Sequence, residues 1–87
     1  MPKFYAIHYT KKIPKMTEAQ KAGLKKALGE AAKKMPAVKF NGAMWDPKTG
    51  IGVADCDAPN LKAAEEFMKM IGAPPSDVVV QVEPMVL

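Results

Sequence analysis

The order of secondary-structure signals along the chain is the feature that most constrains its fold. The segment from Trp45 to Phe67 contains a strand end, the turn sequence DPKTG, a second strand, a helix cap and an amphipathic helix. A strand and a helix precede this segment and a strand follows it, so the chain reads β-α-β-β-α-β. With right-handed crossovers, this order places two helices on one face of a four-stranded antiparallel sheet, the ferredoxin-like arrangement of the α+β class.

Four stretches have the aromatic and β-branched residues that are typical of strands. Between the second and third of them, Pro47 presets φ at an early turn position and Gly50 accepts a positive φ, which predicts an antiparallel hairpin. The expected strands are Lys3–Thr10, Val38–Trp45, Ile51–Cys56 and Asp77–Glu83.

Two helices are predicted between the strands, each with an apolar stripe at helical spacing. Thr17 begins the first helix with the spacing of a capping box, and Pro36 ends it. Asn60 is the expected N-cap of the second helix, and Gly72 the expected C-terminal cap. Gly29 lies inside the first helix, where glycine is unfavourable, and we attribute it to a close approach of this helix to the sheet.

The composition fits one small globular domain that covers residues 1–87. No apolar run reaches the roughly 18 residues needed to cross a bilayer, and the first residues lack the features of a signal peptide. The single cysteine, Cys56, excludes an internal disulfide framework. We therefore expect a cytoplasmic protein without membrane contacts.

The net charge of +4 is concentrated in residues 11–39, which contain nine lysines and two glutamates. All thirteen basic residues are lysines. The lack of arginine argues against specific recognition of nucleic acid, because arginine is the usual bidentate partner of guanine and phosphate. The lysine-rich first helix is then either a solvated face or an interaction module for an acidic partner or, through electrostatic contact, for nucleic acid.

A homodimer is expected from the open face of the predicted sheet. Two helices cover one face only, and a bare apolar face is an association surface. A chain of this length also buries only about 60–65% of its unfolded surface, which favours association. Two sheets packed face to face would form a dimeric α/β barrel that encloses a cavity.

The open face is the expected location of a ligand-binding site. His8 alternates with Ala6, which suggests the open face, although a hydrogen-bonded interface or core histidine is an alternative interpretation. Histidine is suited to ligand contact or acid–base chemistry because its charge changes near neutral pH. The valines at 78, 80 and 82 suit the helix-facing core, which would direct the alternate residues of that strand outward. The expected ligand-binding set is His8, Asn41, Trp45, Gln81 and Glu83.

The patterns FYAIH and MWDPKTGIGVADCDAPNLKAA resemble a family of small uncharacterised bacterial domains that includes nickel-binding proteins. The resemblance extends over residues 3–83. It implies a ferredoxin-like homodimer and, through His8, a nickel site. Metal-binding members carry further histidines in the second helix, where this chain has Met68 and Met70.

The expected function is therefore a homodimer that binds a small ligand or a metal ion on the open sheet face. A cofactor-independent enzyme of the dimeric α/β-barrel type, monooxygenase- or isomerase-like, is one alternative, and the lysine-rich interaction module is another. Cys56 is disfavoured as a nucleophile, because the neighbouring Asp55 and Asp57 would raise the pKa of its thiol.

Overall fold

The secondary structure of the protein was obtained from a computed structural model that describes residues 1–72 and 74–87. It confirms the predicted βαββαβ order, with strand ends that differ from the expected ones by one or two residues. The elements are β1 (Lys3–His8), α1 (Glu18–Lys34), β2 (Lys39–Trp45), β3 (Gly52–Asp57), α2 (Leu61–Met70) and β4 (Val78–Val82).

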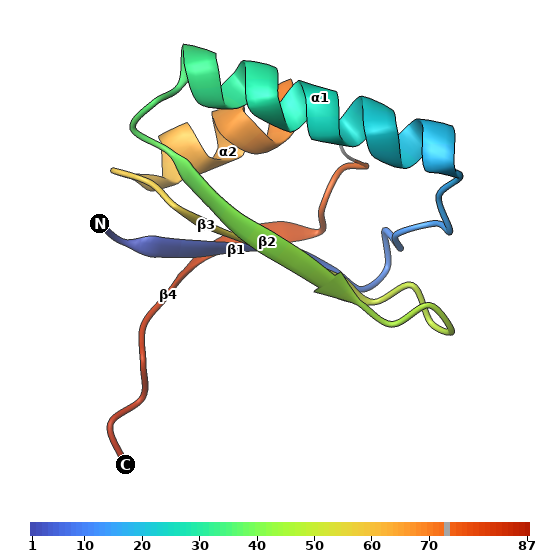
Figure 1. The fold of residues 1–87 in the computed structure, drawn as a ribbon. Helices are drawn as coiled ribbons and strands as arrows, with labels where there is room; N and C mark the ends of the chain where they lie inside the picture. Colours follow the sequence, from blue (N-terminus) through green and yellow to red (C-terminus); the bar gives the residue numbers. More distant parts are fainter. Residues whose placement is uncertain (73) are drawn as a thin grey trace.

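The four strands form one antiparallel sheet in the order β2-β3-β1-β4. β1 lies inside the sheet, between β3 and β4, and β2 pairs with β3 at one edge. Both helices cover the same face of the sheet, and the opposite face is bare (Figure 1). The predicted ferredoxin-like layers are therefore confirmed.

Local capping interactions define the ends of the helices as the sequence predicts. The amide of Gln20 donates to the hydroxyl of Thr17 at 3.1 Å, and the amide of Thr17 donates to the Gln20 side chain at 2.9 Å. Asn60 accepts a hydrogen bond from the amide of Ala63 at 2.9 Å. Gly72, with φ of +68°, follows α2 and donates its amide to the carbonyl of Lys69 at 3.2 Å. These contacts satisfy backbone groups that a helix leaves unpaired at its ends.

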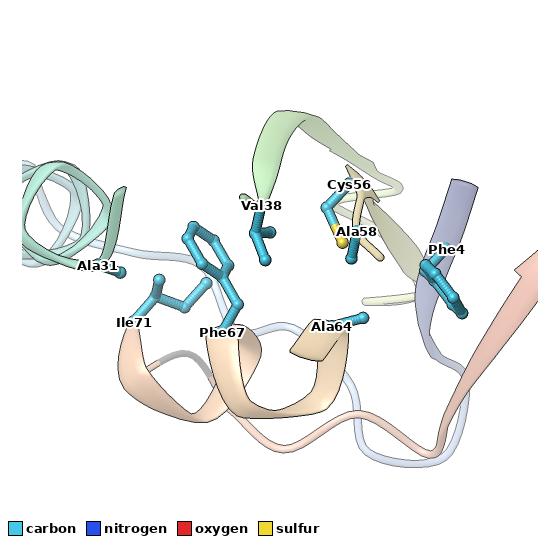
Figure 2. Packing of buried hydrophobic residues seen from close by; sticks show 8 residues of the cluster. All are labelled: Phe4, Ala31, Val38, Cys56, Ala58, Ala64, Phe67 and Ile71. Carbon is cyan, nitrogen blue, oxygen red and sulfur yellow. The ribbon is translucent and has the colours of Figure 1, made fainter. Parts of the chain in front are cut away.

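The core lies between the sheet and α2, and Figure 2 shows its buried side chains. The ring of Phe67, from α2, stacks on Phe40 of β2 with a centroid separation of 6.4 Å. α1 contributes only one buried residue, Ala31. The core cluster consists of Phe4, Ala31, Val38, Cys56, Ala58, Ala64, Phe67 and Ile71.

The explanation offered for Gly29 is wrong. A Cβ atom placed on Gly29 would meet no atom within 4 Å outside its own helix. α1 does not approach the sheet at this position, and Gly29 is exposed. Glycine is therefore not required there by packing.

The prediction for the two faces of β4 is also wrong. Val78 and Val80 pair with Ile7 and Tyr5 of β1, and directly paired residues share a face of the sheet. That face is the open one, because the alternate residue Phe4 belongs to the helix-facing core. Of the β4 valines, Val79 packs against the core cluster. The residues of β4 alternate as predicted, but each set lies on the face opposite to the predicted one. β4 is apolar on both faces, so its sequence does not show which set is buried.

Replacing Gly29 by Ala should raise the free energy of unfolding by about 1 kcal/mol, since alanine is the better helix former and no neighbour obstructs its methyl group. Chemical denaturation measures this change. Gly72→Ala is the matched control: its φ of +68° disfavours a side chain, so it should destabilise the protein. A loss of stability in Gly29→Ala would show that α1 packs more tightly than the structure indicates.

Candidate ligand-binding cavity

A cavity of about 620 Å³ lies between α1 and the helix-facing side of the sheet. Its volume falls in the range of about 300–1,000 Å³ that is common for small-molecule sites. Leu24 and Leu28 of α1 line one side, and Met68 and Ile71 contribute from α2. Of the charged side chains that line it, Lys21, Glu65 and Lys69 are exposed to solvent and Asp77 is half-buried.

Small side chains on three adjacent strands explain why this space is not filled. Ala6 of β1 pairs with Ala54 of β3, which in turn pairs with Ala43 of β2. All three line the cavity, so a row of methyl groups forms its floor. Leu24 and Leu28, opposite this floor, are only half-buried. The alanine row leaves room where larger side chains would otherwise meet α1.

The adjacent row of the sheet brings His8 and Trp45 to the same cavity. His8 pairs with Gly52, and Gly52 pairs with Trp45. A Cβ on Gly52 would lie 2.7 Å from Cδ1 of Ile13 and 2.8 Å from Cβ of Trp45. The glycine therefore lets Ile13 pack down onto the sheet between His8 and Trp45.

A β-bulge in β2 decides which way Trp45 points. Phe40 pairs with Cys56 and Gly42 pairs with Asp55, which are adjacent residues of the antiparallel β3. Asn41 is therefore the extra residue of β2. Gly42 has φ of +140°, a backbone conformation that favours glycine. In a strand without a bulge, residues five positions apart face opposite sides, so Phe40 on the helix-facing side would turn Trp45 to the open face. The bulge places both on the helix-facing side.

His8 is the polar group buried at the cavity wall, with 5% of its surface exposed. Its Nδ1 lies 3.0 Å from the carbonyl oxygen of Lys11. Within residues 1–72 and 74–87, no protein group forms a hydrogen bond with its Nε2. No fully buried side-chain nitrogen or oxygen of these residues lacks a partner, so Nε2 retains some accessible surface. Because His8 lines the cavity, we infer that Nε2 opens to it.

The carboxylate of Asp77 fixes the loop that holds His8. It accepts hydrogen bonds from the amides of Tyr9, Thr10 and Lys11 at 2.7, 3.0 and 3.1 Å, and from the Thr10 hydroxyl. Desolvation raises the pKa of Asp77, but these hydrogen bonds outweigh it and hold the pKa well below its usual range. Lys11, whose carbonyl contacts His8, is thus held at its amide by the residue that precedes β4.

The expected set of five ligand-binding residues is not brought together. His8 and Trp45 lie on the helix-facing side, so the prediction that they face the open side of the sheet is wrong. Gln81 pairs with Phe4 and thus belongs to the helix-facing side as well, but it is exposed on an edge strand. Glu83 lies beyond the end of β4 and is exposed.

Asn41 lies on the open face, within a polar cluster at one end of the sheet. Its amide donates to Asp55 and Asp57, at 3.2 Å each. Lys3 Nζ lies 3.1 Å from Asp55 and 3.8 Å from Asp57. The hydrogen bond to Asp55 raises the pKa of Lys3. Asn41 is therefore occupied by neighbouring side chains and is separated from His8 by the sheet.

Cys56 is buried beneath this cluster. Burial, together with the charges of Asp55 and Asp57, raises the pKa of its thiol to about 11. The direction agrees with the sequence-based expectation, although burial is the larger cause. A thiol that is protonated at neutral pH is a poor nucleophile and a poor metal ligand.

The donor groups do not fit a nickel site. In the described part of the chain, no three His, Cys, Asp or Glu side chains lie close enough to hold a metal ion together. Met68 lines the cavity, whereas Met70 is 42% exposed on the outer side of α2. His8 alone supplies one imidazole nitrogen to the cavity, too few strong donors to hold nickel.

Comparison with known proteins identifies the fold. No protein-family model matches the sequence, and no curated protein is similar to it. Among solved structures, the crystal structure of SCO4226 from Streptomyces coelicolor A3(2) matches with a TM-score of 0.72, over 97% of this chain and 99% of that chain. The fold is that of a small ferredoxin-like domain. The sequence identity of 20% extends the likeness to the fold alone. Neither helix within the described residues is long and apolar enough to span a membrane.

Several residues that shape the cavity were not identified from the sequence. The alanine floor depends on the register of three strands, and the role of Asp77 depends on a contact between residues 66 to 68 positions apart. One usable signal was present: Asp77 precedes the last strand after two prolines, where an aspartate commonly accepts backbone amides.

Asp77→Asn should lower the free energy of unfolding most at neutral pH. Because the pKa of Asp77 is lower in the folded protein than in the unfolded chain, its carboxylate contributes stability above the unfolded pKa of about 3.9 and loses it as the pH falls further. The difference between wild type and variant should therefore narrow below about pH 4. Denaturant titrations at several pH values measure it.

Glu83→Gln is the matched control for this prediction, because Glu83 is an exposed carboxylate outside the loop contacts. Its effect should be small at every pH. A stability difference for Asp77→Asn that does not change with pH would contradict the role given to the charged carboxylate.

Proposed function

We propose that this protein binds a small, predominantly apolar molecule in the cavity between α1 and the sheet, against His8 and Trp45. The observation that carries the proposal is the buried His8 at the wall of a largely apolar cavity, with an Nε2 that has no hydrogen-bond partner among the described residues. This nitrogen keeps accessible surface, so a ligand in the cavity could bond to it in place of water.

The composition of the cavity wall supports the same proposal. Binding sites for small molecules are mainly apolar, with a few polar groups that fix the orientation of the ligand. Phe40 and Trp45 supply aromatic surface, and the alanine row supplies a flat floor. The loop that carries the His8 contact is held at both ends, by Asp77 and by the hydrogen bond from the Ile13 amide to the Gly50 carbonyl at 2.9 Å. A site held in this way loses little entropy when a ligand binds.

Binding is favoured over turnover by the shortage of a second reactive group. General acid–base catalysis needs side chains within hydrogen-bond reach of the reacting atoms. His8 is one such group, but the carboxylate of Asp77 already accepts four hydrogen bonds. Glu65 and Lys69 are solvent-exposed. We therefore place this protein among binding proteins rather than cofactor-independent enzymes.

Ala54→Leu should abolish or strongly weaken binding of an apolar probe, because it adds a larger side chain to the cavity floor. Isothermal titration calorimetry with 2-naphthol measures this effect. Val53→Leu is the matched control, because the neighbouring residue of β3 points to the open face and pairs with Ile7. If both substitutions weakened binding of the probe equally, or if neither weakened it, the probe would not bind in the cavity.

We also propose that the protein forms a homodimer through the open sheet face. This face carries apolar side chains from all four strands, and Met44 is 75% exposed and Val78 39% exposed. Such a surface is costly to leave in water. The apolar residues of this face are Tyr5, Ile7, Met44, Val53, Val78, Val80 and Val82.

This dimer would leave the two ligand cavities separate. His8 lies on the side of its sheet that faces away from the proposed interface. Two His8 side chains would then be separated by two sheets and could not share a metal ion. Each chain would bind its own ligand.

Met44→Glu should shift the protein toward monomers, since it introduces a charge into the proposed interface. Its high exposure means that folding of the single chain should tolerate the change. Met70→Glu, on the exposed side of α2, is the matched control and should leave the oligomeric state unaltered. Sedimentation velocity over a range of protein concentrations distinguishes the two. A wild-type protein that is monomeric at high concentration would refute the dimer.

A further inference from the structure

The hydrogen bond between His8 and Lys11 determines what kind of ligand group the cavity can receive. A backbone carbonyl oxygen can only accept a hydrogen bond, so the Nδ1 atom that lies 3.0 Å from it must carry the proton. In the neutral imidazole the other nitrogen, Nε2, then has a lone pair and no proton. The group that faces the cavity is therefore an acceptor.

The surrounding backbone holds the loop that carries this carbonyl. On one side of it, the Lys11 amide donates to Asp77 at 3.1 Å. Two residues further along, the Ile13 amide donates to the Gly50 carbonyl at 2.9 Å. A Cβ on Gly50 would lie 2.7 Å from Cβ of Lys12, so the loop also packs closely on the β2–β3 turn. The chain on either side of the Lys11 carbonyl is thus held in place beside His8.

The other polar side chains that line the cavity do not compete with His8 as a deep recognition group. The oxygens of Asp77 are occupied by the Tyr9–Lys11 segment. Lys21, Glu65 and Lys69 are exposed to water and can be hydrated whether or not a ligand is present. Ser76 also lines the cavity but is only half-buried, so His8 is the most buried polar side chain of the lining.

On this basis, and resting on the proposed ligand-binding function, we propose that the ligands are neutral aromatic molecules with a hydroxyl group, of the phenol or naphthol class. The hydroxyl donates its hydrogen to Nε2 of His8. The ring lies against the apolar wall formed by the alanine row, Phe40 and Trp45. Carboxylates and ethers of the same shape are disfavoured, because neither presents a hydrogen to the bare nitrogen at neutral pH.

The test compares three probes of nearly the same shape on the full chain. Calorimetry at about pH 7.5, where histidine side chains are ordinarily neutral, measures the affinities of 2-naphthol, 2-methoxynaphthalene and 2-naphthoate. We expect 2-naphthol to bind about tenfold more tightly than either of the others, since they cover Nε2 without donating to it. His8→Phe should remove this preference. Gln81→Ala, an exposed edge residue outside the cavity lining, should retain it.

The outcomes separate this inference from the function on which it rests. Equal affinity for 2-naphthol and 2-methoxynaphthalene, with both blocked by Ala54→Leu, would overturn the selection for a donor and leave cavity binding in place. Tighter binding of 2-naphthoate would show that His8 donates to the ligand, and would also overturn the inference. Failure of all three probes to bind would refute the inference and the proposed function together.

A ligand-independent measurement keeps the inference testable if His8→Phe fails to fold. Nitrogen-15 NMR of the histidine ring in the wild-type protein distinguishes the two neutral tautomers, and His8 is the sole histidine, so its assignment is direct. We expect the proton on Nδ1 and a bare Nε2. A proton on Nε2 of the neutral ring would overturn the inference.

Discussion

The orientation of β1 is the constraint on which the rest of the structure depends. This strand lies between β3 and β4, and its alternate residues Phe4, Ala6 and His8 all face the helices. Phe4 joins the packed core, Ala6 leaves space and His8 supplies a polar group, so one strand passes from the core to the cavity within six residues. Its opposite face, with Tyr5 and Ile7, forms the middle of the bare surface. Both proposed contacts of the protein, with a ligand and with a second copy, follow from this one alternation.

The cavity results from small side chains on the sheet and from incomplete packing of α1. The alanine row keeps the sheet surface low, and α1 has one buried residue in seventeen, with Leu24 and Leu28 only half-buried against the core. α2 behaves differently, since Phe67 and Ala64 pack directly on the sheet. The asymmetry divides the layer between helices and sheet into a packed half, which stabilises the fold, and an open half, which is available to a ligand.

Local signals predicted the elements well, while the faces of the strands could not be assigned from the sequence. The caps at Thr17, Asn60 and Gly72 depend on residues within a few positions, so their signatures are visible in the chain itself. Which residues of β4 face the helices depends on the pairing of β4 with β1. Because β4 has valines on both faces, its sequence alone does not show which face is buried. His8 and Trp45 were identified as candidates, but their common side was not, because it depends on strand register and on the bulge at Asn41. Because of this bulge, every later side chain of β2 lies on the face opposite to the one that regular alternation from Phe40 predicts.

The loose attachment of α1 separates the residues that shape the site from the residues that maintain the fold. Leu24 and Leu28 form the ceiling of the cavity, yet neither belongs to the fully buried core. Both leucines also pack against the edge of that core, so substitution at these positions would change the shape of the space above the alanine floor at some cost in stability. His8 lies on a different element and keeps its loop contact. If the proposed function holds, substitution in one helix would alter the ring systems that the cavity accepts, while the polar group that recognises them would stay the same.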